Sequence, residues 1–246
     1  MEIGAQLFTV RDFCTTLEGL EETLKRIAAI GYKNVQVSGV CDYDPQWMKE
    51  TLDRYGLRCI ITHIPIDRLK NETEAVAAGH TVMDCRYVGL GSYGFHEKTP
   101  ADFAEELAAV PSTLMKAGKY FMFHNHAYEF NKEPDGTYYL DRLAELFPAE
   151  EMGFTLDTYW VSKAGLNPAE WLRHLKGRVP VIHLKDITPD EKMAALGEGT
   201  IDFDAVFAAA EYSGVQYMMV EQDDCYGEDP FACLERSYQY LKQKGF

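Results

Sequence analysis

Histidine and carboxylate side chains recur in the second half of the chain at spacings that suit a metal ion. His124 and His126 are one residue apart in FHNHAYEF, so they point to the same side if this stretch is a strand. Asp157 ends FTLD, His183 lies in VIHLKD and Glu221 lies in MMVEQD. Mixed imidazole and carboxylate donors suit Mn²⁺, Zn²⁺, Co²⁺ or Fe²⁺ better than Ca²⁺. Two histidines satisfied by hydrogen bonds in a core remain the structural alternative.

Residue parity separates these side chains from their apolar neighbours. Counting by twos places Met122, His124 and His126 on one face, and likewise Thr155 with Asp157, His183 with Lys185, and Met219 with Glu221. The intervening residues are apolar: Phe123, Leu156, Ile182, Leu184 and Val220. Ionisable residues on the inner face at the end of each strand indicate a site and not a filled core.

The elements that would position these residues alternate regularly. Five times a helical pattern ends in Gly and enters an apolar, β-prone run: IGYKNVQV, YGLRCII, AGKYFMF, KGRVPVI and SGVQYMMV. Four times a capping residue precedes a proline, at Asp44-Pro45, Thr99-Pro100, Asn167-Pro168 and Asp229-Pro230. These junctions predict strand-to-helix units throughout the chain.

Eight strands are expected, each followed by a helix-length segment. They begin near Ile3, Val35, Cys59, Tyr87, Tyr120, Gly153, Val179 and Tyr217. Eight such units in 246 residues predict an α/β fold of the (β/α)₈ TIM-barrel type, forming a single domain over residues 1–246. An open doubly wound sheet is the alternative. The helix pattern is weakest between residues 67 and 85.

In a barrel, chemistry belongs at the carboxyl ends of the strands. His63 ends the third predicted strand in ITHIP, so four of the seven histidines converge on one rim: His63, His124, His126 and His183. Buried charges need partners, and one divalent cation satisfies several of them at once. The combined pattern favours a metal site.

Composition excludes several other classes of protein. The formal charge of −15 and the absence of a basic run argue against a nucleic acid partner. The first residues form no signal peptide and no apolar run reaches bilayer length, so we expect a cytoplasmic protein without a membrane partner. Six scattered cysteines without a C-x-x-C pair are expected to be reduced packing residues.

Several longer stretches carry a family resemblance: GAQLFTVRD, FHNHAYEF, LDTYWVSKAG, NPAEWLRHLKGRVPVIHLKD, LGEGTIDFDAVF and VEQD. They resemble the xylose isomerase-like TIM-barrel superfamily, specifically its sugar phosphate isomerase/epimerase branch. The resemblance implies one divalent metal, Mn²⁺ first with Zn²⁺, Co²⁺ or Fe²⁺ as alternatives, held by Glu, Asp, His and Glu. Asp157, His183 and Glu221 match the last three ligands. His124 stands where the first Glu is expected, as in a subgroup with an H-N-H motif.

The resemblance also implies a reaction class. Ketose 3-epimerases of this family use two metal-bound glutamates, of which only Glu221 has a counterpart here. A metal that chelates an α-hydroxyketone stabilises the enediolate formed by proton removal. A further acid or base would then be His126, Glu129 or Lys185, in that order. We therefore expect a metal-dependent sugar or cyclitol isomerase or epimerase, with an inosose-type dehydratase as the alternative.

Substrate contacts are predicted at the same rim. His63 matches a family position near substrate or metal, although a hydrogen-bonding role in the core is equally consistent with it. Trp160, Phe8 and Tyr128 could form an apolar wall for a sugar ring, or simply pack. Lys185 could stabilise an oxyanion, or form a surface ion pair with Asp186. We expect a small-molecule sugar or cyclitol as partner, and a homo-oligomer only by resemblance.

Other functions fit the same residues less well. GLGSYG at 89–94 fits G-x-G-x-x-G, but the next helix is expected only at Thr99-Pro100, so no NAD is predicted. Amidohydrolases carry an HxH pair on strand one and not on strand five. An AP endonuclease-like hydrolase needs further ligands, where this chain has Trp160 and Gly89. A non-catalytic barrel with a degraded site is the remaining alternative.

Overall fold

The strands close into a barrel in the computed structural model, which describes all 246 residues. Neighbouring strands are parallel and follow the order β1-β10-β7-β6-β5-β4-β3-β2, with β2 pairing back to β1. Their bounds are β1 Glu2–Gln6, β2 Asn34–Val37, β3 Arg58–His63, β4 Tyr87–Leu90, β5 Tyr120–His124, β6 Met152–Asp157, β7 Val181–Leu184 and β10 Tyr217–Val220. The predicted (β/α)₈ barrel is confirmed.

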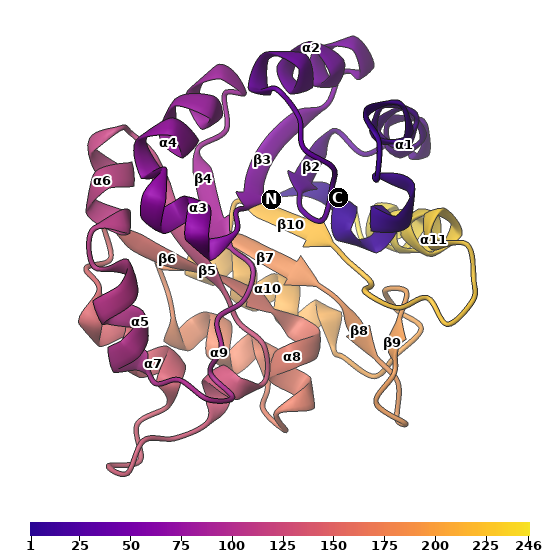
Figure 1. Cartoon of the computed structure of the whole chain (residues 1–246). Coiled ribbons are helices and arrows are strands. Elements are labelled where there is room, and N and C mark those ends of the chain that lie inside the picture. Colours follow the sequence, from indigo (N-terminus) through magenta and orange to yellow (C-terminus); the bar gives the residue numbers. More distant parts are fainter.

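Helices surround this barrel (Figure 1). They are α1 Leu17–Ile30, α2 Pro45–Tyr55, α3 Ile66–Asn71, α4 Thr73–Val82, α5 Pro100–Leu107, α6 Val110–Lys116, α7 Tyr139–Leu146, α8 Thr158–Lys163, α9 Pro168–His174, α10 Phe203–Ser213 and α11 Pro230–Gln243. Two 3₁₀ helices, η1 Leu7–Phe13 and η2 Tyr128–Phe130, follow β1 and β5. None of the helices is long and apolar enough to cross a bilayer.

The junctions lie where the sequence predicts them. The four expected prolines occupy the first turn of α2, α5, α9 and α11, and the Asp44 carboxylate accepts the backbone N–H groups of Gln46 and Trp47 at the start of α2. All five junction glycines have positive φ, as at Gly56 (65°) and Gly214 (86°). The turns of the barrel are therefore encoded locally.

Two connections are less regular than expected. The weak helical pattern after β3 forms two short helices, α3 and α4, because Glu72 has φ −133° and ψ 27°. After β7 the chain first makes an antiparallel pair, β8 Asp186–Ile187 and β9 Met193–Ala194, which projects beyond the end of β7 in Figure 1. The sequence pattern did not predict this hairpin.

One buried carboxylate anchors that hairpin to the barrel. Asp186 accepts the backbone N–H groups of Ile187 (2.9 Å), Gly197 (3.0 Å), Gly199 (2.9 Å) and Ile201 (3.2 Å). A Cβ on Gly199 would lie 2.3 Å from an Asp186 oxygen, so only glycine allows this approach. The segment from 197 to 201, which follows the hairpin, is thereby held next to the end of β7.

Most of the buried apolar residues belong to two clusters. A large core of 57 buried residues lies mostly between the strands and the helices. A second cluster of six, which includes Met122, Val181 and Met219, comes from the inward-facing positions of the strands. The inner cluster fills the barrel immediately below the predicted site.

Candidate active site

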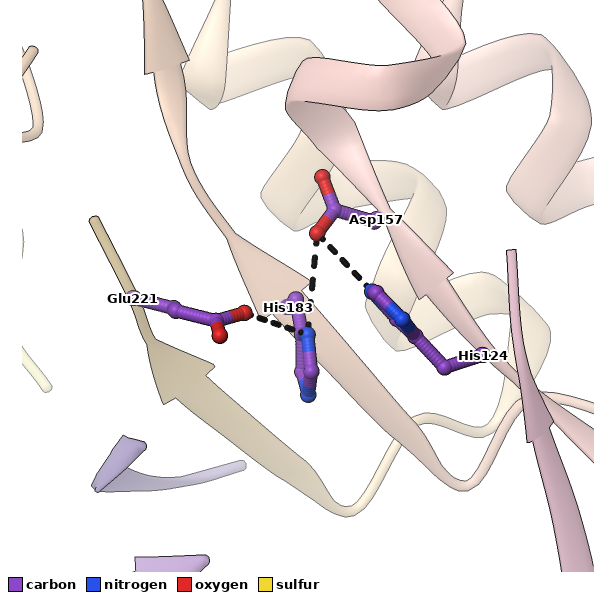
Figure 2. A group of neighbouring side chains, drawn as sticks. All are labelled: His124, Asp157, His183 and Glu221. Carbon is purple, nitrogen blue, oxygen red and sulfur yellow. Dashed lines mark hydrogen bonds and ion pairs between the residues drawn. The ribbon is translucent and has the colours of Figure 1, made fainter. Parts of the chain in front are cut away.

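The four predicted metal ligands meet at the carboxyl edge of the barrel. Asp157 and His183 are paired in register, while His124 pairs with Thr155, and Glu221 directly follows β10. One ligand atom from each of these four ligand residues lies within 4.8 Å of the others, and all four residues are buried. Figure 2 shows Asp157 between the two imidazole rings, with Glu221 on the far side of His183.

The hydrogen bonds of His124 leave one nitrogen free for a ligand. Its Nδ1 lies 2.9 Å from the carbonyl oxygen of Gly91, which can only accept, so Nδ1 carries the proton. Its Nε2 then presents a lone pair at 3.1 Å from Oδ2 of Asp157. A lone pair facing a carboxylate oxygen is unfavourable unless a cation or a proton lies between them.

His183 repeats this arrangement with its nitrogens exchanged. Its Nε2 lies 2.7 Å from the side-chain oxygen of Gln36, which orients the ring. Its Nδ1 lies 2.8 Å from Oε2 of Glu221, yet both atoms are buried and neither forms a hydrogen bond. Unpaired buried polar atoms are costly, and two imidazole nitrogens with two carboxylates are donors that Zn²⁺, Mn²⁺ or Fe²⁺ accepts. The residues therefore fit a divalent cation.

A lysine completes the charged cluster. The Nζ atom of Lys185 lies 3.1 Å from Asp157, 2.9 Å from Glu221 and 2.9 Å from Asp223, and its side chain is 1% exposed. The alternative interpretation of Lys185, a surface ion pair with Asp186, is wrong, because adjacent residues along an extended chain face opposite sides and Asp186 binds backbone N–H groups instead. Lys185 faces the cavity, as predicted for a residue of the site.

A cavity of about 490 Å³ opens above this cluster. Its walls include His63, His124, His126, Lys185, Glu221 and Asp223, and Phe8 closes one side. The arrangement combines a candidate metal centre, an ammonium group and an imidazole around a space for a small molecule. Such a combination is typical of an active site.

A family model described as "Xylose isomerase-like TIM barrel" matches residues 24–243. The chain belongs to this family. A curated inosose dehydratase of Clostridium botulinum (strain Alaska E43 / Type E3) is 22% identical over 91% of this chain and 89% of its own. A solved sugar phosphate isomerase/epimerase of Parabacteroides distasonis, 21% identical, superposes with a TM-score of 0.85 over 99% of this chain and 94% of that one. A solved L-ribulose 3-epimerase, 18% identical, gives a TM-score of 0.78 over the same shares.

Charge in this xylose isomerase-like site is distributed unevenly. Burial opposes ionisation of Asp157 and Glu221, but Lys185 and the histidines hold the pKa of both carboxyls well below the usual range. Burial, followed by Glu221, raises the pKa of Asp223 to about 7. Although burial opposes it, Asp157 and Glu221 raise the pKa of Lys185. The ammonium group therefore stays charged.

His126 and Glu129 are joined through the backbone. The His126 ring lies 4.8 Å from the ring of His124 and 5.0 Å from that of Trp160, measured between centroids. Burial, followed by His124, lowers the pKa of His126 to about 3, so its imidazole is neutral. Glu129 is buried, accepts the backbone N–H of His126 at 2.8 Å and does not line the cavity. Burial raises the pKa of Glu129 to about 7.

The glycines of GLGSYG make room for His63. A Cβ on Gly89 would lie 2.9 Å from the His63 ring, and one on Gly91 would lie 2.7 Å from its Nδ1. The helix after this motif begins only at Pro100, as the sequence predicted. In this protein of the xylose isomerase-like family, the motif therefore serves two histidines. Gly89 and Gly91 leave room for the His63 ring, and the Gly91 carbonyl accepts from Nδ1 of His124 and orients its ring.

His63 itself bridges the cavity wall and the ligand cluster. Its Nε2 lies 2.8 Å from Nε2 of Gln36 and its Nδ1 lies 3.2 Å from Oγ of Ser38. Of the three predicted aromatic residues, Phe8 lines the cavity, Trp160 packs on His126, and Tyr128 is 53% exposed beside His96. Of the predicted substrate contacts, Phe8 and His63 line the cavity and Trp160 and Tyr128 do not.

Two polar residues of the site were not predicted. Gln36 connects His63 to His183 across the barrel, and Asp223 binds Lys185 through both carboxylate oxygens at 3.0 and 2.9 Å. Parity could have found Asp223, because it lies two residues after Glu221 in VEQD. Gln36 occupies an inward position on β2, but glutamine alone carries no chemical signal.

Proposed function

We propose that this protein is a metal-dependent enzyme that removes a proton next to the carbonyl of a sugar or cyclitol. The observation that carries the proposal is the pair of oriented imidazole nitrogens facing Asp157 and Glu221 at the base of a cavity. His124, Asp157, His183 and Glu221 would hold one divalent ion, with Mn²⁺ the first candidate. Such an ion supplies Lewis-acid polarisation of the substrate carbonyl.

Side chains of the protein would carry out the proton transfer and bind the substrate oxygens. Glu221 accepts the proton from the carbon next to the carbonyl, since its carboxylate is ionised at the cavity wall. Lys185 keeps its charge and stabilises the enediolate oxygen. His126 hydrogen-bonds the substrate hydroxyl from the far side, because β5 and β10 are separated by β6 and β7. Glu129 positions His126 through its backbone N–H instead of meeting the substrate.

The site favours loss of water over epimerisation as the outcome. Epimerisation at one carbon needs a second base, and His124 cannot supply it while Nδ1 is bound to Gly91 and Nε2 faces the ligand cluster. Elimination needs only one base and a group that assists the departing hydroxyl, for which His126 and Lys185 are available. The inosose dehydratases among the relatives support this order, whereas the sequence alone placed isomerisation or epimerisation first.

The remaining wall would select the substrate. Phe8 offers an apolar surface to a ring, and its neighbour Arg11 stacks over it at 4.3 Å from the ring centroid. His63 offers a ring edge to the same cavity, where its nitrogens are held by Gln36 and Ser38. Trp160 supports this wall through His126. A cyclic polyol with a free ketone fits these contacts.

Deuterium exchange tests this proposal directly. The Mn²⁺-loaded protein is incubated in D₂O with an inosose or with unphosphorylated ketohexoses, and NMR follows the C–H next to the carbonyl. We expect exchange at that carbon and release of water from the inosose. Glu221→Gln should slow exchange by at least about a hundredfold, while the exposed Glu228→Gln should not change it. Wild-type rates in Glu221→Gln with bound metal would disprove the role of Glu221.

A further inference from the structure

Lys185 occupies a position that a metal site does not require. Its ammonium group contacts Asp157 and Glu221 at 3.1 and 2.9 Å, and both carboxylates belong to the four ligand residues. It also contacts both oxygens of Asp223, at 3.0 and 2.9 Å. Asp223 lies outside the four ligand residues. One buried ammonium group is thus shared between the metal ligands and a third carboxylate.

Two cations close to the same oxygens oppose each other. Two like charges a few ångströms apart repel each other much more strongly in a partly buried site than in water. Asp157 and Glu221 are fully and almost fully buried, so solvent does little to screen this repulsion. Whichever cation is closer to these oxygens therefore weakens the binding of the other.

We propose that Lys185 competes with the divalent ion for Asp157 and Glu221, and that Asp223 receives the ammonium group when the ion binds. The proposal rests on the metal site of the proposed function. The carboxylates of Asp157, Glu221 and Asp223 carry three negative charges. One divalent ion and the ammonium group of Lys185 together carry the three positive charges that balance them. Lys185 and Asp223 would then tune the affinity of the four ligand residues for the metal.

Asp223 is placed to receive the ammonium group. Its side chain is 22% exposed against 0% for Asp157, so it lies on the cavity side of Lys185. Its backbone is fixed from two directions, because its N–H approaches the sulfur of Met193 at 3.2 Å and its carbonyl accepts from Arg11 at 2.9 Å. An ammonium group drawn toward Asp223 moves away from the metal ligands and toward the substrate.

Metal affinity measured without turnover tests the proposal. Titration with Mn²⁺, with the free ion followed by electron paramagnetic resonance, gives the dissociation constant for each variant. Lys185→Met should tighten binding by about tenfold or more, because it removes the competing charge at similar side-chain volume. The exposed Lys163→Met is the matched control and should bind Mn²⁺ as the wild type does.

A double-mutant cycle separates competition from simple loss of charge. Asp223→Asn should weaken Mn²⁺ binding by about tenfold in the wild type, because Lys185 is then left to Asp157 and Glu221 alone. In the Lys185→Met background the same substitution should weaken binding by about threefold or less. An equal effect of Asp223→Asn in both backgrounds, or no tighter binding in Lys185→Met, would overturn the competition.

The outcomes also distinguish this proposal from the proposed function. A wild type that binds no Mn²⁺ contradicts both, whereas saturable binding that is insensitive to Lys185 contradicts only the competition. Binding that follows the cycle in a protein without proton exchange supports the competition and contradicts the enzyme. If Lys185→Met does not fold, as judged by melting in EDTA, the same cycle is measured with Lys185→Gln, which removes the charge and keeps a polar side chain. Lys185→Arg keeps the charge and should not tighten binding.

Discussion

Two layers inside the barrel lie on the same strands and differ completely in chemistry. The lower layer is apolar and includes Met122, Val181 and Met219. Two residues further along the same strands lie His124, His183 and Glu221, which belong to the upper, charged layer. A step of two residues along a strand therefore separates the apolar cluster inside the barrel from the candidate active site. Stability and chemistry are assigned to neighbouring positions and not to different parts of the fold.

The two layers should respond oppositely to substitution. Apolar side chains in the lower layer stabilise the fold through burial and close packing. Like charges and lone pairs in the upper layer are kept together at an energetic cost, which a cation offsets. Variants of the lower layer should therefore lose stability and keep the site, while variants of the upper layer should lose the site and keep the fold.

Asp157→Asn should have the largest effect on function. It removes the carboxylate that faces His124 and Lys185, while the retained Oδ1 still caps α8 through the Trp160 N–H. We expect Mn²⁺ affinity to fall by more than about a hundredfold and proton exchange to be lost. Calorimetric titration measures the affinity, with the exposed Asp135→Asn as control. Full affinity in Asp157→Asn would remove Asp157 from the ligand residues.

Met122→Ala should have the largest effect on stability. Met122 is fully buried in the lower layer, so the cavity left behind should lower the free energy of unfolding by about 2–5 kcal/mol. Urea denaturation in EDTA measures the change, and Met115→Ala, at a residue 38% exposed, is the matched control. Below the unfolding transition Mn²⁺ affinity should stay within about threefold of wild type. A larger loss of affinity would mean that the layers are coupled.

Glu129 is a buried carboxyl without a lysine partner, and it should make the free energy of unfolding depend on pH. Its folded pKa of about 7 lies above the unfolded value near 4.5, so the unfolded chain releases its proton first as pH rises. Stability from this group is present below about pH 4.5 and is lost progressively up to about pH 7, by about 3 kcal/mol.

Glu129→Gln should abolish that loss. Between pH 5 and pH 8 the wild type should lose about 2–3 kcal/mol of unfolding free energy relative to the variant. Urea denaturation at both values measures it, and the exposed Glu150→Gln should follow the wild type. Parallel pH profiles for Glu129→Gln and wild type would mean that Glu129 is ionised in the folded protein throughout this range.

Gln36→Leu should have the smallest effect of these substitutions. It tests whether a neutral residue beside the charged upper layer contributes to Mn²⁺ affinity. Gln36 touches no cation but orients His183 and contacts His63. We expect Mn²⁺ affinity to fall by about 10- to 100-fold, as is usual when the partner of a ligating histidine is lost. Isothermal titration measures it, with the exposed Gln46→Leu as control. Unchanged affinity would show that neighbouring rings alone hold His183.

The sequence predicted the fold and the convergence of the ligands because both depend on local patterns. Glycine and proline junctions mark each strand and helix, and parity assigns His124, Asp157, His183 and Glu221 to the inner face. Closure of the barrel then brings their strand ends together without further information. The strand order and the buried ligand cluster follow from these two rules.

The contacts between ligands depend on the stagger of the strands and could not be predicted. Gln36 meets His183 across 147 residues, and Lys185 meets Asp223 across 38. The alternative pairing of Lys185 with Asp186 was wrong, because adjacent residues of an extended chain point to opposite faces and Asp186 binds backbone N–H groups. Glu129 shares the rim with His126, but the 3₁₀ turn at Tyr128–Phe130 directs its carboxylate back to the backbone.

Asp186 accepts four backbone N–H groups and so fixes the base of the hairpin formed by β8 and β9. The length of the hairpin beyond this base can therefore change without moving the barrel strands. The segment from Thr188 to Lys192 lies beyond these four hydrogen bonds. It contacts α8 at Glu191, whose carbonyl accepts from the Tyr159 hydroxyl at 2.9 Å and whose carboxylate pairs with Lys163. Residues inserted there would extend the hairpin toward solvent while Met193 still returns to Asp223. A longer hairpin would therefore change the rim of the barrel above β7 without changing the order of its strands.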